Sequence, residues 1–162
     1  MNSWIGVYQT AFPAFNQIHF KFPNDGVSFP FHQDSLHRGY GSSNWRDVNG
    51  KGSYVQMVMA IDEVTLENGP MLFIPGSCQS GHLNLPYDES IQTVSPHFDT
   101  KDAVPALMRP GSVALFGPYV IHGSVPNESQ QPRRVFINGF AYPGANSRDY
   151  PGEGSGMLVN IP

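Results

Sequence analysis

The chain has 162 residues, a length that fits one domain of ordinary size with a single hydrophobic core. Its formal net charge of −4 and its lack of a Lys/Arg cluster argue against a phosphate-backbone footprint, and no basic amphipathic stretch indicates a membrane surface. The single cysteine, Cys78, excludes an internal disulfide, and neither a signal-like apolar start nor an apolar run of about 18 residues occurs. We therefore expect a cytoplasmic protein that binds neither nucleic acid nor membrane, with the choice between monomer and homo-oligomer left open.

Alternating apolar and polar side chains predict a mostly β protein with few helices. The six predicted strands are, in chain order, 16–22, 27–34, 53–62, 70–77, 112–122 and 133–142. The connecting stretches NDG, ENGP, RPGS and PNESQQP are rich in residues that favour turns. With 17 glycines, 15 prolines and only 14% charged residues, the composition suits an antiparallel sandwich or barrel better than a helical bundle.

Two long segments, 35–52 and 78–104, fit no strand. Loops of this length in a compact domain are more often functional lids than idle connections, with a flexible surface excursion as the alternative. The tail over 143–162 is predicted to be irregular.

The second predicted strand ends in FPFHQDS, which places His32 and Asp34 two positions apart. In an extended strand these side chains point to the same face, so an imidazole and a carboxylate would lie together. A ferrous site of the two-histidine, one-carboxylate kind needs one more imidazole. His122, which closes the apolar run SVALFGPYVI, is the best candidate, the alternative being a histidine that is hydrogen-bonded at a strand end.

Eleven residues after His122, Arg133 opens the last predicted strand, and a hairpin would bring the two side chains into one cavity. A guanidinium group binds a carboxylate through two parallel hydrogen bonds, which suits the distal carboxylate of 2-oxoglutarate. Strand alternation sends Arg134 to the opposite face, where we expect a solvated surface charge.

Four stretches in this order, FHQD, VTLENGPMLFIPGS, RPGSVALFGPYVIHGSVPNES and RRVFINGFAY, together resemble the phytanoyl-CoA dioxygenase family of Fe(II)/2-oxoglutarate oxygenases, over roughly residues 16–145. The resemblance implies a double-stranded β-helix, a cupin-like jelly-roll with the metal at its open mouth. It also implies a catalytic set in which His32, Asp34 and His122 bind iron and Arg133 pairs with the 2-oxoglutarate carboxylate.

Three further residues of the cosubstrate site follow from the same resemblance. Ser124 matches a hydroxyl that assists the pairing with Arg133, and Phe29 would pack beside 2-oxoglutarate. His19 occupies a strand position where relatives often place an asparagine near 2-oxoglutarate. Cys78 stands in a PGSC turn where relatives often read PGSH.

The implied chemistry uses Fe(II), 2-oxoglutarate and O2 to hydroxylate an aliphatic C–H bond of a small organic substrate, with succinate and CO2 as coproducts. Retention of Asp34 favours hydroxylation, because halogenating relatives lack the carboxylate ligand. The alternatives are a non-catalytic jelly-roll module that binds a metal or a carboxylate ligand, and a zinc hydrolase. Candidate substrate contacts are His37, Arg38, Tyr40, Trp45, Arg46, Asn138 and Tyr142.

We expect a single oxygenase domain over 1–162. Family members usually carry a helical region well before the H-x-D strand, whereas 31 residues precede His32 in this sequence. If such helices normally cover the larger sheet, a domain without them would expose an apolar face and favour self-association.

Overall fold

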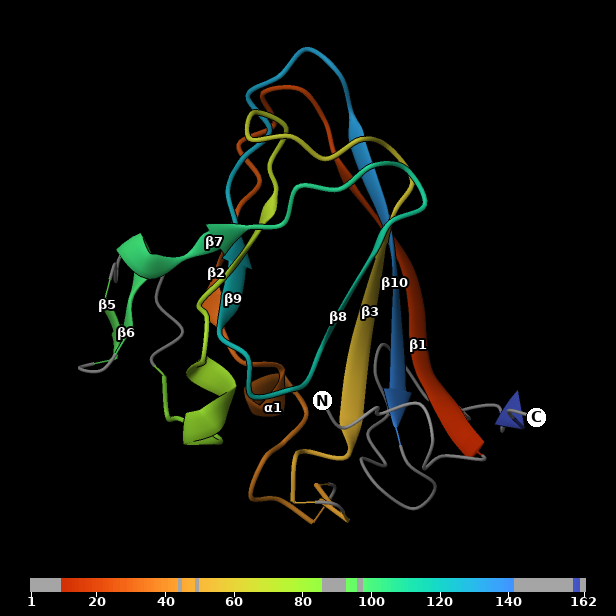
Figure 1. Cartoon of the computed structure of the whole chain (residues 1–162), viewed down its shortest axis with the longest axis vertical. Helices are drawn as coiled ribbons and strands as arrows, with labels where there is room; N and C mark the ends of the chain where they lie inside the picture. Colours follow the sequence, from red (N-terminus) through yellow and green to blue (C-terminus); the bar gives the residue numbers. More distant parts are fainter. Residues whose placement is uncertain are drawn as a thin grey trace.

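Two antiparallel sheets face each other in the computed structural model, which describes residues 10–43, 45–48, 50–85, 93–95, 98–141 and 159–160. The large sheet has the order β11-β1-β10-β3-β8, and the small sheet has the order β2-β9-β4-β7. Figure 1 shows β2, β7 and β9 on one side and β8, β3, β10 and β1 on the other. The mostly β jelly-roll predicted from the sequence is confirmed.

The elements have the following bounds. The large sheet consists of β1 (Thr10–Lys21), β3 (Tyr54–Ala60), β8 (Val113–Phe116), β10 (Arg133–Ala141) and β11 (Val159–Asn160). The small sheet consists of β2 (Phe29–His32), β4 (Met71–Phe73), β7 (Val104–Pro105) and β9 (His122–Ser124). A separate pair is formed by β5 (Thr93–Ser95) and β6 (Phe98–Asp99), and the described helices are α1 (Asp34–His37), η2 (Ser77–Ser80) and η3 (Thr100–Asp102).

The hydrophobic core lies between the two sheets because alternate side chains of each long strand point inward. Along β3 and β10 buried and less buried residues alternate with the two-residue period of a strand. The main cluster of buried side chains consists of Val58, Ala60, Val64, Met108, Phe116, Val135 and Ile137, with Met71 and Phe73 of β4 packed against it. On the outer face of the large sheet, Ile18, Phe20 and Leu115 are exposed. Self-association through this face stays a prediction.

The prediction of one strand over 112–122 is wrong. The chain leaves the large sheet after Phe116, turns through Gly117 and Pro118, and enters the small sheet as β9 at His122. Proline has no N–H to donate to a ladder, so an unbroken strand through Pro118 is disfavoured. Because β9 and β10 belong to different sheets, the predicted hairpin between His122 and Arg133 is wrong as well.

The second predicted strand is also shorter than expected. β2 ends at His32, and Asp34 is the first residue of the one-turn helix α1. The segment 35–52 therefore begins as a helix. Its later part is closed by local hydrogen bonds, because Asp47 accepts from Gly52 N at 2.7 Å and from Ser53 Oγ at 2.8 Å. The segment 78–104 contains η3 and the β5–β6 pair among its described residues.

Two residues of the predicted irregular tail are described, and they form β11, which pairs with β1. The rest of 143–162 lies outside the described residues. Among the described helices, none is long and apolar enough to span a membrane.

Candidate functional site

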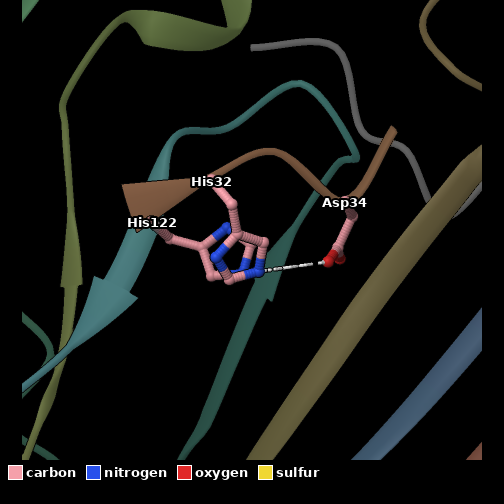
Figure 2. A group of neighbouring side chains, drawn as sticks. All are labelled: His32, Asp34 and His122. Atoms are coloured by element: carbon pink, nitrogen blue, oxygen red, sulfur yellow. Dashed lines mark ion pairs between the residues drawn. The ribbon is translucent and has the colours of Figure 1, made fainter. Parts of the chain in front are cut away.

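Two histidines and one aspartate meet at the end of the small sheet. His32 of β2 and His122 of β9 are register partners, and their ring centroids lie 4.4 Å apart. The Nε2 atom of each ring lies 3.9 Å from Asp34 Oδ1, and the ligand atoms of the three residues all lie within 4.8 Å of one another (Figure 2). Asp34 reaches the histidines from the first position of α1, not from the strand itself.

Backbone carbonyls fix the orientation of both imidazoles. His32 Nδ1 donates to Pro30 O at 2.7 Å, and His122 Nδ1 donates to Val120 O at 3.0 Å. Because a carbonyl oxygen only accepts, the proton of each neutral ring sits on Nδ1, and Nε2 is the nitrogen whose lone pair can coordinate a metal. Burial and the neighbouring His122 lower the pKa of His32 to about 4, so this ring is neutral and able to coordinate a cation at physiological pH.

The carboxylate of Asp34 completes a donor set that fits a divalent metal. Asp34 is buried, and its Oδ2 atom has no hydrogen-bond partner. A buried carboxylate oxygen without a partner is costly unless a cation or a donor satisfies it. Two imidazoles and one carboxylate are the typical protein ligands of non-haem Fe(II), and they leave adjacent coordination positions open.

A cavity of about 550 Å³ adjoins these three residues and extends between the sheets. The sequence-predicted cosubstrate residues His19, Phe29, Ser124 and Arg133 all line it. Arg133 is buried and donates through Nε to Asn68 O at 3.4 Å and through a terminal nitrogen to Gly69 O. The structure thus brings the histidine and arginine together across the sandwich, although they do not share a hairpin.

The chain matches the family model described as phytanoyl-CoA dioxygenase (PhyH) over residues 7–135. It belongs to this family. A methylphosphonate hydroxylase of Gimesia maris is 33% identical over 119 residues, which are 74% of this chain and 41% of that relative.

Solved structures share the fold of this phytanoyl-CoA dioxygenase family member. The apo form of the non-heme monooxygenase ThoJ superposes with a TM-score of 0.73 at 20% identity, covering 95% of this chain and 54% of that one. EvdO2 of Micromonospora carbonacea, complexed with 2-oxoglutarate, superposes with a TM-score of 0.62 at 21% identity, covering 94% and 54%. The chain therefore spans about half the length of these proteins or less.

Of the predicted substrate contacts, only part line the cavity. His37 and Arg38 do so. Tyr40 stacks on His82 with ring centroids 3.9 Å apart, and Trp45 packs near Tyr119. Arg46 and Asn138 are not among the lining residues, and Tyr142 lies outside the described residues. Arg134 is the predicted surface charge, paired with Asp62 at 2.7 Å.

The sequence interpretation missed Gln33 and Lys21. Gln33 is 1% exposed, and its side-chain amide donates to Gly81 O at 2.9 Å and Tyr119 O at 2.7 Å while accepting from Leu83 N at 2.7 Å. It therefore fixes the backbone between two candidate metal ligands. Lys21 is also buried and lines the cavity, and strand alternation, which puts it on the same face as His19, could have indicated this.

Proposed function

We propose that this protein is an Fe(II)- and 2-oxoglutarate-dependent dioxygenase that hydroxylates an aliphatic C–H bond of a small organic substrate, releasing succinate and CO2. The observation that carries the proposal is a single cavity that is lined both by two histidines and an aspartate, the ligands typical of ferrous iron, and by the buried Arg133. The family membership and the name of the relative from Gimesia maris support it.

In this proposal His32, Asp34 and His122 hold the metal. The imidazoles coordinate through Nε2, because their Nδ1 protons are engaged by backbone carbonyls. Asp34 would supply a negatively charged oxygen ligand to the ferrous ion, and the cation would satisfy its unpartnered oxygen. When bound, iron with 2-oxoglutarate and O2 supplies the oxidation of the C–H bond.

In this proposal residues of both sheets hold the cosubstrate, Arg133 and His19 from the large sheet and Ser124 and Phe29 from the small sheet. 2-Oxoglutarate has a keto-acid group that binds iron and a distal carboxylate at its other end, and Arg133 is the residue that takes the distal carboxylate. Ser124 contributes its hydroxyl beside Arg133, and the Phe29 ring forms an apolar wall. His19 stacks on Phe29 with ring centroids 5.8 Å apart, and burial and the charge of Arg133 lower its pKa, so it takes part as a neutral ring.

The test is an anaerobic titration of the apoprotein with Fe(II) and then 2-oxoglutarate, which gives a visible metal-to-ligand charge-transfer band when the keto acid chelates the metal. We expect the band in the parent, its loss in Asp34→Ala, and a requirement for more 2-oxoglutarate in Arg133→Ala. Arg134→Ala is the matched control, because Arg134 is the next residue of β10 but points outward to Asp62.

A folded parent protein that shows no band would contradict the proposal. A band without succinate formation under O2 would indicate a jelly-roll module that binds metal and carboxylate without turnover, which was the alternative interpretation of the sequence.

A further inference from the structure

Lys21 is a buried lysine at the carboxyl end of β1, and its side chain is only 2% exposed. Its Nζ atom donates to Ser124 Oγ at 2.8 Å and to Val125 O, and the Phe29 ring centroid lies 5.6 Å away. These partners are neutral, and no described carboxylate forms an ion pair with Lys21. Burial, with Arg133 as the next contribution, lowers the pKa of Lys21 to about 8, so the side chain is still mostly a cation at neutral pH.

A second buried cation stands directly opposite. Lys21 and Arg133 are register partners in the β1–β10 pair, and both line the same cavity. Like charges at opposed positions of neighbouring strands repel each other, and the repulsion grows when the groups are withdrawn from water. Among the described acids, Asp25 raises the pKa of both Lys21 and Arg133. Its carboxylate accepts hydrogen bonds from the backbone N–H groups of Phe22 and Val27 in an exposed turn.

The backbone at Gly69 packs closely against the side chains of the two cations. Gly69 has φ +79°, and a Cβ atom there would lie 2.8 Å from Lys21 Cδ and 2.8 Å from Val125 O. The carbonyl of the same glycine accepts a hydrogen bond from Arg133. The lysine stem and the guanidinium group therefore converge on Gly69, and the fold holds both charges in place at the cavity wall.

An ammonium group has three N–H donors, and the described residues supply acceptors for two of them. The third N–H remains for a ligand. In addition, Ser124 Oγ accepts from Lys21, so the serine hydroxyl proton is itself available to donate. A carboxylate offers about four lone-pair sites, enough for a guanidinium edge, an ammonium N–H and a hydroxyl together.

We propose that Lys21 is a second cationic binding residue for the distal carboxylate of 2-oxoglutarate, acting with Arg133 and Ser124. The inference rests on the proposed function and assigns a role to a residue outside the set carried by the family resemblance. The bound carboxylate relieves the repulsion between the two cations, so both charges contribute to retention of the cosubstrate.

The experiment measures the dissociation constant of 2-oxoglutarate from the charge-transfer band under anaerobic Fe(II). Lys21→Met keeps the approximate shape without a donor, whereas Lys21→Gln keeps a donor for Ser124 without the charge. Lys101→Met is the control, because Lys101 is an exposed lysine in η3. Thermal melting verifies that each variant is folded. Pyruvate, titrated in parallel, has the keto-acid group but no distal carboxylate.

We expect both Lys21 variants to raise the dissociation constant of 2-oxoglutarate at least about tenfold, while pyruvate binding and the Lys101 variant match the parent. A normal dissociation constant in both folded Lys21 variants would overturn the inference and leave the proposed function intact. Parent-like binding in Lys21→Gln alone, or an equal loss of pyruvate binding, would overturn the role of the charge. Absence of the band in the parent would overturn both proposals.

Discussion

Gly69 is the position where a single methyl group should do most damage to the cosubstrate end of the cavity. Gly69→Ala places an L-residue at φ +79°, which costs about 1 to 2 kcal/mol in the left-handed region. The new Cβ would also lie 2.8 Å from Val125 O, a backbone atom, and 3.2 Å from Asn127 N. Overpacking of this kind typically costs about 1 to 3 kcal/mol more, so we expect a total loss of roughly 2 to 5 kcal/mol in the free energy of unfolding.

Two other glycines separate the backbone cost from the packing cost. Gly76 has φ +76° and Gly111 has φ +82°, but a Cβ atom at either would meet nothing within 4 Å. Urea unfolding of Gly76→Ala and Gly111→Ala should show only the backbone cost of about 1 to 2 kcal/mol. If Gly69→Ala is no less stable than these two variants, the Lys21 stem and the Val125 carbonyl are not packed against Gly69 as described.

Three further predictions concern the metal and cosubstrate ends. Because burial and Arg133 lower the pKa of Lys21 to about 8, the side chain loses its charge as the pH rises through that value. The affinity for 2-oxoglutarate should therefore fall over this pH range in the parent and stay level in Lys21→Met. Titrations of 2-oxoglutarate at a series of pH values measure this. Gln33→Ala removes the three hydrogen bonds by which the Gln33 side chain holds the backbone of Gly81, Leu83 and Tyr119, and it should weaken Fe(II) binding at the neighbouring residues about 10- to 100-fold, measured by competition with a chelator. Since Asp34 is retained, product analysis in high chloride should give alcohol, and mainly chlorinated product would contradict this.

The donor set could be found from the sequence because it depends on short-range patterns. His32 and Asp34 are two residues apart, and His122 ends a strongly apolar run. The route by which His122 meets Arg133 could not be found in this way. Which sheet a strand joins depends on contacts between distant segments, and the apolar run continues across Gly117 and Pro118 although the chain changes sheets there.

Lys21 escaped the sequence interpretation for a different reason. Lysine is seldom fully buried, so polarity suggests an exposed end of the first strand. Its burial follows from the second sheet, because Ser124 and Val125 cover the side chain from the opposite side of the sandwich. Tyr40 and Trp45 do not line the cavity as predicted, because their rings pack against each other and against Tyr119.

The two sheets supply different ligand-binding residues, and this links cosubstrate binding to the stability of the fold. The candidate metal ligands come from the small sheet and the turn after it, whereas Lys21 and Arg133 come from the large sheet. The hydrogen bond from Lys21 to Ser124 joins the two sheets at the cavity itself. A ligand that bridges the metal and both cations binds only when the sheets are packed together, so its binding free energy adds to the stability of the packed state. Without a ligand, the repulsion between the two buried cations destabilises the protein. A carboxylate that binds between them while its keto-acid group binds the metal neutralises this repulsion, and the relief adds to the affinity for the ligand.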